Sequence, residues 1–372
     1  MARQQLMQFI DERKGQVMLE IGPFMNPAIR KEVHNVYYAD IRSKDEIYNF
    51  YLKHNLCTPE ELYERIAPID FVIKDTYEKA MDGKKFNVIF SSHVIEHVND
   101  IIFHLQDLAA ILNDDGYLVM AIPDKRYCFD HFREVTPFRD MLDVYLNGSV
   151  NSTARLAFDG FNGHRCNDPE AYHSNSVSFS SMIDSGIDDY YWTYLNQYKS
   201  VRDKEMVLSE HNWVFTCTSF LDCLRDMLRA NMLPFSCFYF DTTPENIFEF
   251  TIILQKNISI MNDKEKRIDE IQKIINMSEQ NSEVSCFIQK TELLQAGHNA
   301  IQKSLQDEIN ALNCKISAYE SNINHLKEEH ATERNILLAE KDNQYHAFIN
   351  SNSWKITAPF RAITRIFRRV GL

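Results

Sequence analysis

A change of sequence pattern near residue 258 divides the chain into parts with different folding requirements. Before it, short apolar runs alternate with segments of helical periodicity, which is typical of a parallel sheet covered by helices. After it, Gly and Pro nearly vanish until Pro359, and Glu, Lys, Gln and Asn mix with Ile and Leu. The sequence therefore predicts an α/β domain at 1–257, a helical segment at 258–348 and a distinct tail at 349–372.

Seven apolar runs in the first part have the length of strands. Five of them suit a buried parallel sheet because they are short and largely apolar: Val17–Ile21, Val36–Ile41, Phe71–Ile73, Phe86–Ser91 and Tyr117–Ile122. The last two, Phe235–Phe240 and Phe248–Leu254, are separated by a short, turn-rich link. Such a link favours an antiparallel pair, since a parallel crossover needs a longer connection.

Two residues at the ends of these runs suit a nucleotide-like ligand, because ligands of open parallel sheets bind outside the carboxyl ends of the strands. Gly22 follows the first run and allows the backbone a close approach to a cofactor. Asp40 lies about 20 residues further on, where a carboxylate accepts hydrogen bonds from ribose hydroxyls. The residues after Pro23 include none of the further glycines that a pyrophosphate would need, which weakens a nicotinamide-cofactor interpretation.

The segments at the strand ends resemble those of class I S-adenosylmethionine (SAM)-dependent methyltransferases. Leu19–Pro23 is similar to the first motif of that family, and Phe90–His97 is similar to its fourth-strand signature. The resemblance covers about residues 16–256 and implies a Rossmann-like seven-stranded methyltransferase sheet with SAM as cofactor. The cofactor-binding residues that it implies are Glu20, Gly22, Pro23, Asn26, Asp40, Ile41, Asp75, Ser91, His93 and His97.

The acceptor side is expected in the polar region after the fifth run. Segments 122–127 and 211–216 resemble a bacterial subgroup of these methyltransferases found with polysaccharide-synthesis enzymes. A sugar hydroxyl needs a general base near pH 7, and the candidates are His211, His164 and Asp124. A phosphate acceptor would instead need cations, so Lys125, Arg126 and Tyr127 are candidates for substrate binding. The sequence does not decide whether the acceptor group is a hydroxyl or a phosphate. An ordinary structural role is the alternative for each of these residues.

Composition argues against several other functions. His164, Cys166, His173 and His211 match no known spacing of zinc ligands, so no metal site is expected. The 8 cysteines include no CxxC pair, which argues against a disulfide framework. The net charge of −13 argues against nucleic-acid binding. No apolar run reaches the roughly 20 residues of a membrane span, and a cytoplasmic protein is expected.

The second part contains a heptad pattern, with apolar residues at alternating spacings of four and three. Its members are Leu305, Ile309, Leu312, Ile316, Tyr319, Ile323 and Leu326. This period predicts a coiled coil that joins copies of the chain, and the alternative is one amphipathic helix folded back on the domain. A separate apolar stripe occurs earlier, at Ile268, Ile271 and Ile275.

The tail has a different character, because residues 343–372 contain no acidic side chain. Apolar residues that share one helical face alternate with basic ones, which predicts a helix bound to a membrane surface. The apolar and basic residues are Trp354, Phe360, Ile363, Ile366, Phe367, Val370, Lys355, Arg361, Arg365, Arg368 and Arg369. Docking on a protein is the alternative.

The order of catalytic domain, coiled coil and membrane helix resembles the chain-terminating methyltransferases of bacterial O-antigen synthesis. The resemblance implies an oligomer at the cytoplasmic face of the inner membrane that caps the non-reducing end of a lipid-linked polysaccharide and helps set its length. A glycosyltransferase is a possible further partner. Two alternatives remain: a non-catalytic scaffold of a glycan-synthesis complex, and a small-molecule methyltransferase with a helical tail.

Overall fold

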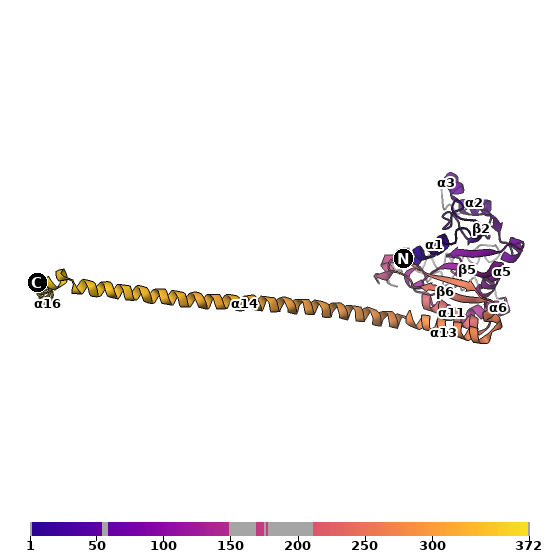
Figure 1. Cartoon of the computed structure of the whole chain (residues 1–372). Coiled ribbons are helices and arrows are strands. Elements are labelled where there is room, and N and C mark those ends of the chain that lie inside the picture. Colours follow the sequence, from indigo (N-terminus) through magenta and orange to yellow (C-terminus); the bar gives the residue numbers. More distant parts are fainter. Residues whose placement is uncertain (1, 54–58, 149–168, 175, 178–210, 371–372) are drawn as a thin grey trace, which may run out of the picture. The chain divides into compact units, whose positions relative to one another are not determined.

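The computed structural model describes residues 2–53, 59–148, 169–174, 176–177 and 211–370 (Figure 1). The chain forms two compact units, Met1–Cys286 and Phe287–Leu372. The strands are β1 (Met18–Ile21), β2 (Val36–Asp40), β3 (Phe71–Val72), β4 (Phe86–Ser92), β5 (Leu112–Pro123), β6 (Phe235–Asp241) and β7 (Glu249–Lys256). The helices of the first unit are α1 (Ala2–Asp11), α2 (Lys44–Lys53), α3 (Pro59–Arg65), α4 (Tyr77–Met81), α5 (Ile101–Ile111), the 3₁₀ helix η1 (Lys125–Tyr127), α6 (Phe138–Asn147), α8 (Pro169–His173), α11 (Cys217–Arg229), α12 (Ser259–Asn262) and α13 (Lys264–Gln280).

The strands form one seven-stranded sheet of order β3-β2-β1-β4-β5-β7-β6. The first five strands are parallel, and β7 runs antiparallel to both of its neighbours. The predicted Rossmann-like sheet with a terminal antiparallel pair is therefore confirmed. The chain moves outward from β1 to β3 and then returns to the other side of β1 at β4. This reversal places a ligand crevice at the carboxyl ends of β1 and β4.

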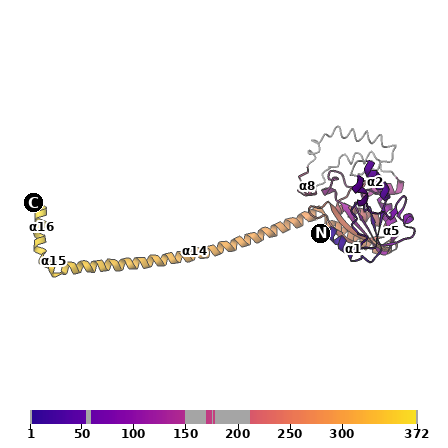
Figure 2. The same ribbon diagram turned by 90° about the horizontal axis from the view of Figure 1, so that it is seen from above.

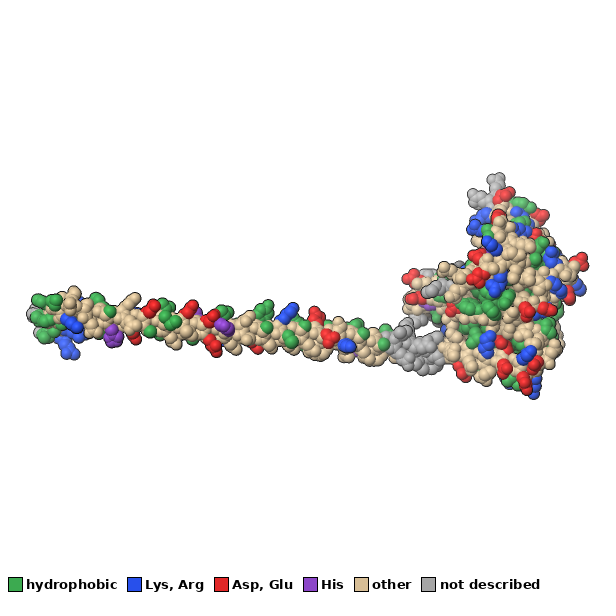
Figure 3. Space-filling model, in the orientation of Figure 1, with side chains coloured by type: hydrophobic (Ala, Val, Ile, Leu, Met, Phe, Trp, Pro, Cys, Tyr) green, Lys and Arg blue, Asp and Glu red, His purple; other side chains and the backbone are tan. Residues whose placement is uncertain are grey.

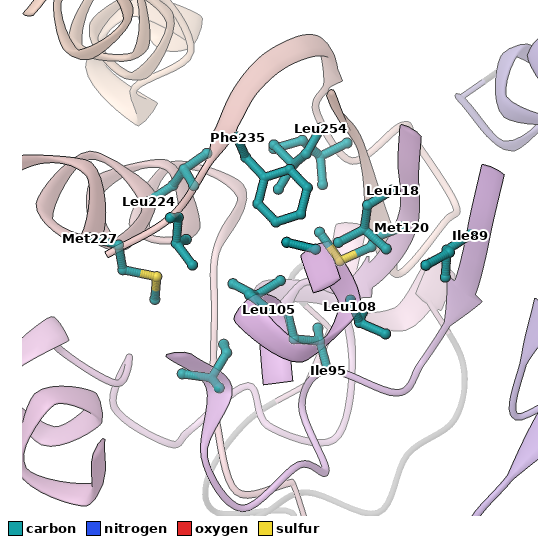
Figure 4. Close-up of a cluster of buried hydrophobic side chains, with 14 of the residues drawn as sticks. Ile89, Ile95, Leu105, Leu108, Leu118, Met120, Leu224, Met227, Phe235 and Leu254 are labelled. Carbon is teal, nitrogen blue, oxygen red and sulfur yellow. The ribbon is translucent and has the colours of Figure 1, made fainter. Parts of the chain in front are cut away.

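Alternating side chains of the sheet build two hydrophobic layers, as the period of two along a strand requires. On β5, Leu118 and Met120 face a core that includes α5 and α11, whereas Val119 and Ala121 face a smaller core closed by α1. Figure 4 shows Leu105 and Leu108 of α5 beside the β5 side chains. Both faces of the sheet are therefore covered, and the strand ends are left for binding.

Helix α13 belongs to the first unit, although the sequence places it in the predicted coiled-coil segment. It packs against α11, and the side chain of Ile274 is fully buried. The Glu270 carboxylate accepts a hydrogen bond from the backbone N–H of Cys237 at 2.7 Å. The change of pattern near residue 258 marks the end of β7 and not the end of the unit, which extends to Cys286. A helix that covers a core with one narrow stripe has the same pattern as a coiled-coil strand, so the predicted boundary lies too early.

The second unit consists almost entirely of α14 (Glu283–Asn350), a continuous helix of 68 residues. At roughly 1.5 Å per residue it is about 100 Å long. Its heptad side chains are exposed, as Leu312 at 52% and Ile316 at 53% illustrate. Apolar side chains recur along the helix in Figure 3. The coiled coil itself stays a prediction.

Two short helices, α15 (Asn352–Ile356) and α16 (Ala358–Val370), follow α14 within the same unit (Figure 2). The Ser351 hydroxyl caps α15 by accepting a hydrogen bond from the N–H of Trp354 at 3.2 Å. The Arg361 guanidinium lies 3.4 Å from the centre of the Trp354 ring. The side chains of Phe360, Ile363 and Ile366 on α16 are exposed, at 70%, 48% and 62%. Among the described residues, no helix is both long and apolar enough to cross a bilayer.

Candidate functional site

The turn after β1 has a backbone that only glycine adopts easily. Gly22 has φ +67°, and its N–H donates a hydrogen bond to the Ala39 carbonyl at 2.9 Å. A Cβ at this position would lie 3.1 Å from Cγ2 of Val94. The left-handed conformation and the crowding both disfavour a larger residue. The end of β1 is therefore a narrow backbone cradle.

Glu20 shapes the loop that follows this turn. Its two carboxylate oxygens accept hydrogen bonds from the backbone N–H groups of Ala28 and Ile29, at 2.8 and 2.9 Å. Burial raises the pKa of Glu20 to about 7, although these two hydrogen bonds oppose the shift. The loop contains Pro23, whose carbonyl accepts from the N–H of Asn26 at 3.2 Å. Glu20 thus fixes the backbone of the loop that follows the Gly22 turn.

Asp40 ends β2, beside the end of β1. Its Oδ1 accepts the N–H of Arg42 at 3.0 Å, and burial raises the pKa of the carboxyl. The next side chain, Ile41, is 54% exposed. Asp75 stands apart from this pair, because its exposed carboxylate forms an ion pair with Lys79. The structure therefore brings Gly22 and Asp40 together and places Asp75 at the surface.

The segment after β4 carries three titratable side chains near one another, His93, Glu96 and His97. Ser91 is buried in β4, and His93 makes the turn with φ 55°. The Nε2 of His93 lies 2.7 Å from Oε2 of Glu249, at the start of β7. Burial would raise the pKa of Glu249, but the hydrogen bond with His93 and the charge of Arg3 outweigh burial and hold it low. Glu96 is 1% exposed, and burial raises its pKa against the pull of His211 and His93.

His211 lies across from this segment, held in one orientation. Its Nδ1 is 2.5 Å from Oδ2 of Asp130, whose Oδ1 accepts a hydrogen bond from Arg133 at 2.6 Å. Burial alone would raise the pKa of Asp130, but the bonds with His211 and Arg133 hold it below its usual value. The Nε2 of His211 points to Glu96 Oε1 at 3.8 Å, and the ring contacts His97.

A cavity of about 140 Å³ adjoins these histidines. It lies at the carboxyl ends of β4 and β5, and aromatic side chains form much of its wall. The Tyr127 ring stacks on His173 with centroids 3.7 Å apart and an interplanar angle of 2°. The lining residues are His93, Pro123, Tyr127, Cys128, Phe129, Pro169, His211 and Phe248.

Asp124 and Arg126 bind each other beside the cavity. The Arg126 guanidinium donates to both oxygens of Asp124, at 3.0 and 2.7 Å, and the hydroxyl of Thr243 donates to Oδ2 at 2.7 Å. Asp124 is fully buried, so it is poorly placed to take a proton from an acceptor. The ammonium of Lys125 donates to the carbonyl of His131 at 2.8 Å. Of the three predicted substrate-binding residues, Tyr127 lines the cavity, whereas the charged groups of Lys125 and Arg126 bind protein atoms.

Residues 12–171 match the family model described as methyltransferase domain. This segment of the chain therefore carries a methyltransferase domain. No curated protein matches the chain. SAM is the cofactor of this domain, and the residues fit it: Gly22 offers a backbone without Cβ, and Asp40 offers a carboxylate one strand away. The absence of further glycines at the turn agrees with a cofactor that has no pyrophosphate.

Solved structures of other methyltransferases are similar to the chain at low identity. A SAM-dependent methyltransferase from Mesorhizobium loti shares 12% identity over 68% of this chain and 96% of its own, with a TM-score of 0.33. A putative one from Listeria monocytogenes shares 11% identity over 69% and 96%, with a TM-score of 0.34. The CurJ carbon methyltransferase shares 10% identity over 66% of this chain, with a TM-score of 0.31, and the chain spans about half (49%) of it. Nothing about substrate follows from likenesses of this size.

The structure places the predicted acceptor-side residues against different neighbours. His164 lies outside the described residues, as does Cys166 of the four-residue zinc grouping. His173 stacks on Tyr127, and His211 lies instead beside Glu96 and His97. Sequence reasoning missed Glu96, Asp130 and Glu249 as site residues. Glu96 lies within the Ile-Glu-His signature and was open to notice, whereas nothing local marks the other two.

Proposed function

We propose that this chain is a SAM-dependent O-methyltransferase that acts on a hydroxyl of a cell-surface polysaccharide, capping the non-reducing end of a lipid-linked O-antigen chain and thereby limiting its length. The observation that carries the proposal is the cavity beside the end of β4, with His211 in its wall. The Gly22 turn follows β1 and the cavity residue His93 follows the neighbouring parallel strand β4, so donor and acceptor can meet at these strand ends.

His211 is the candidate general base for the acceptor hydroxyl. Asp130 fixes the imidazole through Nδ1, which leaves Nε2 on the side of Glu96 and the cavity. A carboxylate that holds a histidine in one orientation through one ring nitrogen supports proton removal by the other. The stacked Tyr127 and His173 rings offer a flat apolar face on which a sugar ring can pack. In the reaction, the acceptor oxygen forms the bond to the methyl group supplied by SAM.

The second unit fits an enzyme that works on a membrane-bound chain. An exposed heptad stripe on α14 suits pairing with other copies, because exposed Leu and Ile in this period bury one another in a coiled coil. The α16 helix ends with Arg368 and Arg369 and has no acidic residue in its first turn. Such a helix suits the anionic cytoplasmic surface of the inner membrane, and a glycosyltransferase at that surface is a further candidate partner.

Methyl transfer from labelled SAM to the lipid-linked glycan of the source organism tests the activity. The expected product carries the methyl group on the terminal non-reducing sugar, as linkage analysis would identify. The His173→Gln variant keeps His211 intact and should weaken acceptor binding, whereas His211→Gln should lower the rate. Label on internal sugars contradicts capping. Failure to bind SAM in calorimetry supports a non-catalytic scaffold. Methyl transfer to small molecules but not to glycan supports a small-molecule methyltransferase with a helical tail.

Flotation with vesicles tests the membrane anchor separately. The full chain should float with vesicles that contain anionic lipid, and a chain ending at Asn350 should not. The double variant Arg368→Glu/Arg369→Glu keeps the full length of the chain but reverses the charge beside the apolar face of α16. It should float less than the wild type. Equal flotation of all three proteins would contradict the anchor.

A further inference from the structure

Glu96 is a buried carboxylate whose oxygens are unsatisfied hydrogen-bond acceptors among the described residues. Its side chain is 1% exposed, and among the described residues neither carboxylate oxygen accepts a hydrogen bond. A buried carboxylate without hydrogen bonds is strongly disfavoured unless a cation lies beside it. The groups that face it are ring nitrogens of His93, His97 and His211, each 3.6–3.8 Å from Oε1. These distances are too long for hydrogen bonds.

Three side chains converge on one point. One ligand atom from each of Glu96, His97 and His211 lies within 4.8 Å of the others. Zinc-like ions bind such atoms at about 2.0–2.2 Å, which separates tetrahedral ligand atoms by roughly 3.4 Å. Small side-chain movements therefore suffice to complete a site. His93 also faces Glu96 through Nδ1, but its Nε2 binds Glu249 at 2.7 Å, and it is not one of the three converging residues.

Hydrogen bonds to neighbouring residues orient His211 and fix the backbone of Glu96. The bond from Nδ1 of His211 to Asp130 leaves the Nε2 lone pair directed at Glu96. A carboxylate bound to the outer nitrogen of a ligand histidine is a recurring support of metal sites. The backbone N–H groups of Asn212 and Trp213 donate to the Glu96 carbonyl at 2.7 and 3.1 Å, and this fixes the two ligand-bearing segments against each other.

We propose that Glu96, His97 and His211 bind a divalent transition-metal ion, of the Zn²⁺ or Mn²⁺ type, in the wall of the acceptor cavity. Two neutral imidazoles and one carboxylate form a set that leaves a coordination position open. His211 lines the cavity, and the His97 side chain is 41% exposed, so the open position can receive an acceptor oxygen. This catalytic role rests on the function proposed above, whereas the binding of the ion does not.

The ion changes how the acceptor is activated. A hydroxyl bound to a divalent cation has a lowered pKa, and its proton leaves to water on the exposed His97 side. The oxygen lone pair then forms the C–O bond to the methyl carbon. The C–S bond breaks, and its electron pair stays on sulfur as S-adenosylhomocysteine leaves. His211 then holds the ion in place of taking the proton itself.

Metal binding by the full chain tests the site without reference to activity. After treatment with chelator, the wild type should bind one Zn²⁺ or Mn²⁺ per chain, as measured by calorimetry and elemental analysis. Glu96→Gln and His97→Gln should weaken binding at least 100-fold, and Asp130→Asn should weaken it roughly 10- to 100-fold. His97 is partly exposed, so that variant should fold even if Glu96→Gln does not. The control is His325→Gln on α14, whose side chain is 72% exposed.

The outcomes separate the ion from the proposed reaction. A wild type that binds no stoichiometric ion overturns the site, as do Glu96→Gln and His97→Gln variants that bind as tightly as the wild type. Chelator-treated enzyme that methylates the glycan at the full rate overturns the catalytic role and returns His211 to the position of base. A chain that binds the ion with the expected variant pattern but methylates no glycan supports the site and contradicts the proposed function.

Discussion

Replacing Ile274 by Ala in α13 decides whether this helix stabilises the methyltransferase unit or serves a coiled coil. Ile274 is fully buried, and α13 packs on α11 of the first unit. Deleting a buried isoleucine beyond Cβ costs about 2–5 kcal/mol, because apolar burial is lost and a cavity remains. With a urea dependence of about 2 kcal/mol/M, a loss of 3 kcal/mol lowers the unfolding midpoint by about 1.5 M. The fluorescence of buried Trp213 follows this unit in a Trp192→Phe/Trp354→Phe background.

Ile268 on the same helix supplies the matched control, because it is 51% exposed and receives the same substitution. Its change should lie within about 0.5 kcal/mol. A helix that served a coiled coil through Ile268, Ile271 and Ile275 would give the opposite result. Ile268→Ala would then alter the oligomeric state, and Ile274→Ala would leave the midpoint of the first unit unchanged. That pattern would refute the assignment of α13 to the first unit.

Three further predictions concern the cofactor turn, its supporting carboxylate and the long helix. Gly22→Ala forces a left-handed residue against Val94 and should weaken SAM binding tenfold or more in calorimetry. Gly83→Ala (φ +81°, with open space) should share the backbone cost of about 1–2 kcal/mol and keep SAM affinity, and equal loss in both would contradict the cradle. Because burial raises the pKa of Glu20 from 4.5 to about 7, stability should fall by about 3 kcal/mol as pH rises between these values, since the unfolded chain loses the proton first. Glu20→Gln should flatten that part of the urea-unfolding profile, and parallel profiles would exclude the shift. Leu312→Lys should lower the oligomeric state in sedimentation, Lys315→Ala should not, and a monomeric wild type would exclude the coiled coil.

The sheet, and the placement of Gly22 and Asp40 at the ends of neighbouring strands, were predictable because their signals are local. A buried strand needs a short apolar run, and a ligand at its end needs Gly or a carboxylate just after that run, as at Gly22 and Asp40. The α13 boundary was not predictable from periodicity. One apolar stripe suits both a partner helix and a helix such as α11 within the same unit.

The acceptor side was less predictable because its contacts join distant segments. Asp130 and His211 are far apart in sequence, and neither has a neighbour that marks the pairing. Asp124 was a candidate base and Arg126 a candidate for binding an anionic acceptor. In the structure these two side chains form an ion pair with each other. The sequence pattern gives the charge of a side chain, but only the fold shows which groups satisfy it.

The position of the cavity explains why family membership leaves the acceptor open. The family match ends at residue 171, and it contains Gly22, Asp40 and Glu96. His211, Phe248 and Glu249 lie beyond it, yet the first two line the cavity and Glu249 holds His93. The Gly22 turn therefore belongs to the matched segment, whereas part of the cavity wall comes from the chain that follows it. We expect that replacing Phe248, which lines this wall and is neither the proposed base nor a proposed metal ligand, changes the acceptor that is methylated and preserves SAM binding in calorimetry.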